Sequence, residues 1–203
     1  MSTPGTNYAR SGTARRTSRR EHRMNDTPGP DDATDPAPRW LTPHELRTWV
    51  RLAAVVELLP GVLDTQLQRD AELTHFEYFT LAMLSEAPER TLRMTALASR
   101  TNATLPRLSH VVSRLEARGF VRREPCAQDR RATNAVLTDA GWEKVVATAP
   151  GHVATVRQHV VDALTPEQVE QLGEITAALL TRLDPDGRMA ALAYANEELP
   201  DAP

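Results

Sequence analysis

One amphipathic segment, residues 105–118, restricts the possible folds more than any other part of the sequence. Pro106 lies in the first turn of the expected helix, where a missing N–H costs no hydrogen bond, and Gly119 follows its end, where glycine is favoured. Four apolar residues share one face at helical spacing: Leu108, Val111, Val112 and Leu115. The other face is polar and basic. This helix must therefore pack on a core through one side and leave the other side to solvent or a partner.

The segments on either side of this helix complete a helix-turn-helix with a β wing. Met94–Arg100 predicts a short helix, and the polar residues 101–104 form a turn. Residues 120–124 and 133–137 have β character and predict a hairpin, whose polar loop spans residues 126–131. In such a unit the second helix lies in the major groove of DNA and the wing reaches an adjacent groove. We therefore expect a fold that is mainly α with a small β wing.

Positive charge is concentrated in this same part of the chain. Residues 90–131 hold ten arginines and three acidic residues, a net charge of +7, whereas the whole chain carries −3. A basic segment in an acidic protein favours a surface for a polyanion, with a merely solvated basic face as the alternative. Arginine can read guanine edges, and serine and histidine can donate to phosphates or bases. The candidate DNA contacts on the outer face of the helix are Arg107, Ser109, His110, Ser113 and Arg114.

Further helices flank this unit on both sides. Capping boxes at residues 42–45, 74–77 and 165–168 predict three helix starts. Apolar stripes predict long helices over Thr42–Leu59, Asp139–Leu164 and Pro166–Leu183. Pro60-Gly61 is expected to bend or break the first of them, and Pro150-Gly151 to kink or interrupt the second. The apolar stripes are broader than a single small domain needs, which agrees with burial against a partner.

Residues 42–183 resemble the MarR family of transcriptional regulators. The matching pieces are Met94-Thr95-Ala96-Leu97-Ala98, the helix residues 108–119 and Phe120-Val121-Arg122-Arg123. The most specific piece is the wing, where Asp129-Arg130-Arg131 is followed by Leu137-Thr138 and then Gly141. The resemblance implies that Arg131 inserts into the minor groove, where negative potential is high, and that Asp129 pairs with a nearby arginine and stiffens the wing. Arg130 joins them in the candidate DNA site.

The resemblance also implies an organisation and a mode of action. A winged-helix domain over residues 39–183 would contain a DNA-binding lobe at about 74–138 and an α-helical dimerisation region at about 42–70 and 139–183. A homodimer would place two recognition helices about 34 Å apart on a pseudo-palindromic operator, as a ligand-responsive repressor. A small aromatic or phenolic effector would bind near Trp49, His75, Phe76, Tyr78, Phe79 and Met83. The alternative is that these six residues pack in the ordinary hydrophobic core.

The two ends of the chain have the composition of tails. Residues 1–38 contain almost no large apolar residue and are expected to be disordered. This segment carries arginines that could touch DNA non-specifically, at positions 15, 16, 19, 20 and 23, unless Met24 is the true start. Residues 184–203 form an acidic tail, in which residues 189–199 could carry a short helix.

Several functional classes are excluded or disfavoured by what the sequence lacks. A single cysteine, Cys126, cannot form an intramolecular disulfide or a Cys-rich zinc site. The sequence has neither a secretory signal nor an apolar run that could cross a membrane, so we expect a cytoplasmic protein. It also has no Gly-rich phosphate loop, nucleophile elbow or His-Glu-x-x-His motif. We therefore expect no enzyme, no cofactor and no metal.

Three alternatives keep the fold and change the function. A metal sensor would use His152, His159 and Asp162, which come closest to a ligand cluster on a dimerisation helix. A redox sensor would use Cys126, whose thiol pKa the neighbouring arginines 122, 123 and 130 could lower. A protein-interaction module would use the wing and helix without DNA, but such a face would show more exposed apolar residues.

Overall fold

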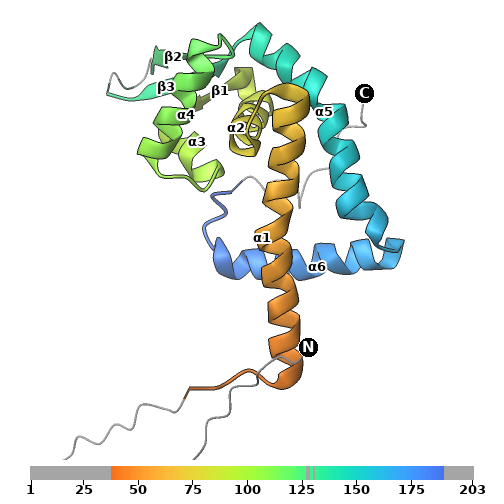
Figure 1. The fold of residues 1–203 in the computed structure, drawn as a ribbon. Helices are drawn as coiled ribbons and strands as arrows, with labels where there is room; N and C mark the ends of the chain where they lie inside the picture. The colour runs from red at the N-terminus through yellow and green to blue at the C-terminus, as the bar shows by residue number, and fades with distance from the viewer. Residues whose placement is uncertain (1–37, 127–128, 130, 190–203) are drawn as a thin grey trace, which may run out of the picture. The chain divides into compact units, whose positions relative to one another are not determined.

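The computed structural model describes residues 38–126, 129 and 131–189, and every element below belongs to one unit that begins at Leu41. The expected tails at 1–37 and 190–203, with their arginines and the C-terminal helix, lie outside the described residues, as does Arg130. The elements in chain order (Figure 1) are α1 (Pro43–Ala71), α2 (His75–Ser85), the 3-10 helix η1 (Pro88–Arg90), β1 (Thr91–Arg93), α3 (Met94–Arg100), α4 (Leu105–Ala117), β2 (Val121–Pro125), β3 (Thr133–Leu137), α5 (Asp139–His159), the 3-10 helix η2 (Val161–Ala163) and α6 (Pro166–Leu183).

Side-chain caps set the starts of the helices. The three predicted capping boxes are all present, with Thr42, Thr74 and Thr165 as N-caps of α1, α2 and α6. Thr104 and Thr138 cap α4 and α5 by accepting a hydrogen bond from a backbone N–H three residues later. Each cap satisfies an N–H that the first turn of a helix leaves without a partner.

The two internal prolines do not end their helices, so the expected alternatives of a break at Pro60 and an interruption at Pro150 are wrong. α1 continues through Pro60 to Ala71 instead of ending at Leu59, and α5 continues through Pro150 to His159. A proline in a helix removes the hydrogen bond to the carbonyl four residues earlier. The carbonyls that lose this hydrogen bond belong to Val56 and Val146, two residues that are 60% and 52% exposed in the single chain.

A three-stranded antiparallel sheet joins the wing to the rest of the lobe. The strand order is β1-β3-β2, so the predicted hairpin of β2 and β3 is confirmed and β1 extends it on the other side of β3. Ala135 of β3 is paired with Leu92 of β1 on one side and with Arg123 of β2 on the other. The wing therefore extends from a strand that is held on both edges.

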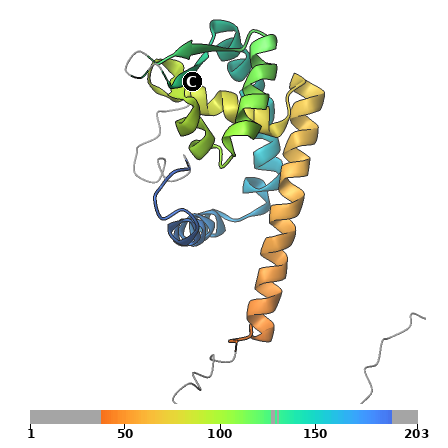
Figure 2. The same ribbon diagram turned by 90° about the vertical axis from the view of Figure 1, so that its left-hand side faces the viewer.

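The hydrophobic core occupies the lobe formed by the C-terminal end of α1, α2 to α4, the sheet and the start of α5 (Figures 1 and 2). Its fully buried leucines lie on α1, the α1–α2 junction, α2, α3 and α4: Leu67, Leu73, Leu81, Leu84, Leu97, Leu108 and Leu115. Burying one such side chain contributes about 1.5–3 kcal/mol. This core fixes α4 from beneath and thereby positions its outer face.

Large apolar side chains outside this lobe are exposed. They follow α1 from its start to Leu58, the outer side of α5 and the length of α6, and include Trp49, Val50, Val55, Val56, Leu58, Val146, Val153, Val169, Leu172, Ile175 and Leu179. α6 contains no buried residue. Within the described part of the chain, no helix is long and apolar enough to cross a membrane.

Candidate nucleic-acid interface

The turn between α3 and α4 is built by local hydrogen bonds. Thr101, at the end of α3, is buried, and its hydroxyl donates to the carbonyl of Leu97 at 2.8 Å. Asn102 adopts a left-handed backbone conformation (φ 48°), which asparagine tolerates better than most residues. The N–H of Ala103 then donates to the carbonyl of Ala98 at 2.9 Å. This turn sets the angle at which α4 leaves α3.

α4 presents the face that the sequence predicts. Leu108, Val111, Val112 and Leu115 are buried in the core. On the other side, Arg107, His110, Ser113 and Arg114 are exposed and Ser109 is half-buried. The five candidate contacts of α4 therefore lie outside the core, and which of them touch DNA stays a prediction.

Two serines of this face also hold the wing. The Arg123 guanidinium of β2 donates to the carbonyl of Ser109 at 2.7 Å and to the hydroxyl of Ser113 at 2.9 Å. The same guanidinium pairs with Glu116 at 3.2 Å, and Glu116 also accepts the backbone N–H of Arg123. Sequence reasoning missed this role of Arg123. The available signal was an acid seven residues earlier, across the turn at Gly119.

The wing loop is stiffened by Asp129 through the backbone. Its carboxylate accepts the N–H of Arg131 at 3.1 Å, and its carbonyl accepts the N–H of Ala132 at 2.8 Å. The expected pairing of Asp129 with an arginine side chain stays a prediction, because the neighbouring Arg130 lies outside the described residues. Arg131 itself is exposed. Asp129 thus shapes the turn from which Arg131 projects.

A basic hollow of about 400 Å³ lies between α3, α4 and the wing. Its lining includes three arginines, Arg93, Arg123 and Arg131, together with Ser109 and Thr133. Like charges that lie close together raise the local positive potential, and a concave wall focuses it. This hollow makes the surface between the helix and the wing attractive to phosphates.

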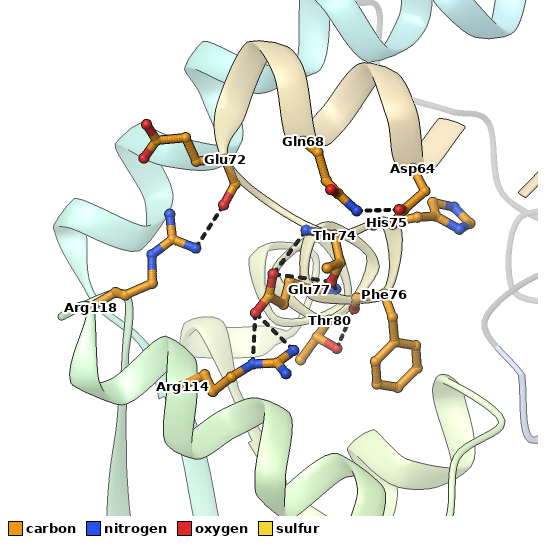
Figure 3. A network of polar contacts seen from close by, with 10 residues as sticks. All are labelled: Asp64, Gln68, Glu72, Thr74, His75, Phe76, Glu77, Thr80, Arg114 and Arg118. Carbon is orange, nitrogen blue, oxygen red and sulfur yellow. Dashed lines mark hydrogen bonds and ion pairs between the residues drawn. The ribbon is translucent and has the colours of Figure 1, made fainter. Parts of the chain in front are cut away.

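Two arginines of α4 contact the first turn of α2, and Figure 3 shows the contact of Arg114. The guanidinium of Arg107 stacks over the ring of Phe76, 4.4 Å from its centroid. Arg114 donates from Nε and Nη2 to Oε1 of the buried Glu77, at 3.1 and 3.0 Å. The sequence placed both arginines on the outer stripe, and their partners on α2 were not foreseen.

The six candidate effector residues do not gather in one site. Tyr78 and Met83 are buried core residues, while Phe76 and Phe79 are partly buried against that core. Trp49 is 56% exposed and lies fifteen residues before Asp64, which is about 22 Å along α1. Asp64 is the residue that accepts the backbone N–H of His75, at 2.8 Å. Trp49 is therefore remote from the other five.

His75 lies in a half-buried histidine cluster where α1, α2 and α5 meet. Its ring stacks with that of His152 of α5 at 6.4 Å between centroids, and Tyr78 packs on His152 at 4.7 Å. Burial lowers the pKa of His75, although Asp64 acts in the opposite direction. Burial also lowers the pKa of His152, and the charge of His75 adds to this effect. A neutral His75 is a poor partner for an anionic ligand.

The residues behind the metal and redox alternatives are engaged elsewhere. Asp162 pairs with Arg157 at 2.6 Å, and His152 packs on Tyr78. No cluster of three or more potential metal ligands occurs among the described residues. Cys126 is buried, with 2% of its surface exposed, so the redox alternative lacks an accessible thiol in the single chain.

A helix-turn-helix that exposes a polar second helix, followed by an arginine-bearing wing, defines the class of winged-helix DNA-binding proteins. The comparisons narrow this class. The model of the MarR family matches residues 73–133. The chain is similar to Sco3205 of Streptomyces coelicolor, a MarR family transcriptional regulator whose crystal structure is a complex with DNA. The two are 50% identical over 74% of this chain and 94% of that chain, with a TM-score of 0.71.

Two further solved structures resemble the chain. AbsC, a MarR family transcriptional regulator of Streptomyces coelicolor, is 40% identical over 72% of this chain and 98% of that chain, with a TM-score of 0.68. MepR of S. aureus, solved with DNA, shares the fold at 23% identity over 70% of this chain and 99% of that chain, with a TM-score of 0.57. The chain belongs to the MarR family of transcriptional regulators.

Proposed function

We propose that the protein is a cytoplasmic, sequence-specific repressor that binds a pseudo-palindromic operator as a homodimer. The observation that supports this proposal most directly is that one chain carries two distinct surfaces. One is the polar face of α4 with the wing, and the other is the exposed apolar face of α1, α5 and α6. A symmetric pair of chains would cover the second surface and present the first surface twice.

The dimer is supported by the amount of apolar surface that a single chain leaves exposed. Contiguous apolar patches of this kind mark interaction sites, because their exposure to water is costly. An apolar groove of about 640 Å³ between α1, η2 and α6 is continuous with this face. Val55 and Leu58 from α1 and Ile175 from α6 line the groove and are exposed in the single chain. A second copy would fill it.

The DNA contact is supported by charge and by likeness. Arg107, His110 and Ser113 are exposed on α4, and the wing presents Arg131 next to the basic hollow. Sco3205, at 50% identity, was solved in complex with DNA. We propose that α4 enters the major groove and that Arg131, with Arg130 beside it, approaches the minor groove.

The test is selection of bound duplexes from a random pool by the full chain, followed by binding to the DNA that flanks its own gene. We expect enriched duplexes with two inverted half-sites about one helical turn apart. Enrichment of single half-sites without symmetry, or no enrichment, would contradict the proposal. Sedimentation of the wild type should show a dimer, and Ile175→Glu in the exposed apolar face should shift it towards a monomer.

Response to a small aromatic or phenolic effector is the second part of the proposal, and it rests on family membership alone. The expected result is that an aromatic carboxylate or a phenol lowers the affinity for the selected duplex, because it binds better to a dimer with mismatched helix spacing. If His75 takes part, His75→Ala blunts this release and leaves binding without the effector intact. An unchanged response would remove His75 from the effector site.

A further inference from the structure

The first turn of α2 contacts the recognition helix at two points. Phe76 stacks under Arg107 and the neighbouring Glu77 binds Arg114. These two arginines are seven residues apart, which is two turns or about 10 Å along α4. Two contacts at this separation fix both the height and the rotation of α4 above α2.

Glu77 divides its two carboxylate oxygens between two tasks (Figure 3). Oε2 accepts the N–H and the hydroxyl of Thr74, at 2.8 and 3.0 Å, and thereby caps α2. Oε1 accepts both nitrogens of the Arg114 guanidinium. The Glu77 side chain is 7% exposed, whereas that of Arg114 is 47% exposed. A buried carboxylate needs this partner, so the arginine is held by more than surface attraction.

The first turn of α2 is also hydrogen-bonded to α1. Asp64 of α1 accepts the N–H of His75, the residue before Phe76. The carbonyl of Glu72, which ends α1 in a left-handed conformation, accepts from the guanidinium of Arg118 at the end of α4, at 2.9 Å. α4 is therefore linked to α1 directly and through the first turn of α2.

Building on the proposed function, we propose that Glu77 is a positioning residue for DNA recognition, which sets the orientation of α4 through Arg114. In this mode of recognition, Arg114 anchors the helix and does not contact DNA. Arg107, which stacks on Phe76, faces the DNA. The alternative is that Arg114 leaves Glu77 and binds a phosphate. The two possibilities differ in the sign of one effect, because removing the charge of Glu77 misplaces α4 in the first case and frees a cation for DNA in the second.

Glu77→Gln isolates this effect, because the protein already shows that glutamine can close such a cap. At α6, the Gln168 side chain accepts the N–H of Thr165 at 3.0 Å in a complete capping box. Glu77→Gln should therefore keep α2 capped through its amide oxygen, while its NH2 group, a donor, replaces the oxygen that accepts from Arg114 and so breaks the ion pair. Glu45→Gln is the matched control, since Glu45 occupies the same position in the Thr42 box and is exposed.

The experiment measures the affinity of the full chain for two duplexes, the one that the wild type selects from the random pool and a scrambled duplex of equal composition. The proteins are the wild type, Glu77→Gln, Arg114→Gln, the double variant and Glu45→Gln. Each is titrated at several salt concentrations, and thermal unfolding is followed by circular dichroism. A positioning role predicts that each single change at Glu77 or Arg114 weakens the selected duplex by about tenfold, a level that such assays resolve readily.

Three further readouts should follow a positioning role. The double variant should bind no more weakly than the weaker single variant, because both changes remove one interaction. Binding to the scrambled duplex and the salt dependence should match the wild type, because no phosphate contact is lost. Glu45→Gln should leave both affinities unchanged.

The inference is overturned if Glu77→Gln binds the selected duplex as tightly as the wild type or more tightly. It is also overturned if Arg114→Gln weakens both duplexes alike and lowers the slope of log affinity against log salt by about 0.9, the value for one phosphate contact. A wild type that selects no duplex would overturn the proposed function and this inference with it. If the wild type selects a duplex and the Glu77→Gln variant binds that duplex with the same affinity, only this inference is overturned.

Discussion

Gly141 lies where the first turn of α5 passes the start of the wing, and its replacement by alanine tests how closely the two approach. A Cβ at this position would lie 2.1 Å from the carbonyl oxygen of Phe120 and 2.7 Å from a methyl group of Leu137. Contacts under 3.0 Å are essentially never seen for a Cβ, and a backbone oxygen cannot rotate away. α5 and the segment at Phe120 must therefore separate by about 1 Å.

This separation acts on two hydrogen bonds that join the same segments. The N–H of Thr138 donates to the carbonyl of Phe120 at 3.0 Å, and the Thr138 hydroxyl donates to the carbonyl of Gly119 at 2.6 Å. Overpacking costs about 1–3 kcal/mol, and each weakened hydrogen bond costs about 1 kcal/mol. Alanine returns about 0.5–1 kcal/mol through its better helix propensity. We expect Gly141→Ala to lower the free energy of unfolding by about 2–4.5 kcal/mol.

The assay is urea unfolding and calorimetry at one fixed protein concentration, because association would make the midpoint depend on concentration. The loss corresponds to a fall in Tm of roughly 4–18 °C for a chain of this size. Gly173→Ala in α6 is the matched control, since nothing lies within 4 Å of the added Cβ, and it should be neutral or slightly stabilising. A Gly141→Ala protein that melts at the wild-type temperature would refute the close approach of α5 to the wing.

Three further predictions concern DNA binding and pH. Arg131→Ala should weaken all duplexes and weaken those with A·T-rich flanks most, because a narrow minor groove favours an inserted arginine; titrations at physiological salt test this, and unchanged affinity would exclude Arg131 from the interface. Arg107→Ala should relax base preference at one position per half-site and cost about 1–3 kcal/mol, whereas a uniform loss across sequences would assign Arg107 to phosphate. Burial lowers the pKa of His75 and His152, so the unfolded chain binds protons more readily. Stability should therefore be full above the ordinary histidine pKa of about 6.5 and fall with acidification below it, as urea unfolding at a series of pH values would show, and His152→Gln should reduce this fall.

Local rules explain why so much of the architecture could be predicted from the sequence. The threonine caps act within three residues, and the amphipathic pattern of α4 and the alternation in the hairpin are readable along the chain. The extent of α1 was not readable in this way. Whether the helix continues past Pro60 depends on how the tertiary structure accommodates the hydrogen bond that the proline removes, and no spacing rule along the chain reports that.

The candidate site shows the same division. Periodicity places Arg107 and Arg114 outside the core, but it does not reveal that residues 76 and 77 of α2 contact these two arginines. Those contacts join positions more than thirty residues apart, and no spacing rule reports them. The effector residues stay a prediction for a related reason, because aromatic residues at helical spacing serve a core and a pocket equally well, and Trp49 was joined to the others by chemistry alone.

The lack of any buried residue in α6 has a consequence for the life of a newly made chain. Most of the stability of a helix in a protein comes from the packing of its apolar face, and here the rest of the same chain leaves every residue of α6 at least partly accessible. In the proposed dimer a second copy would cover α6. A single chain would leave this end accessible to proteases, while the winged lobe would be protected by its own core. Dimer formation would then determine how long a chain survives as well as whether it binds its operator. Proteolysis of unpaired chains would begin at this end.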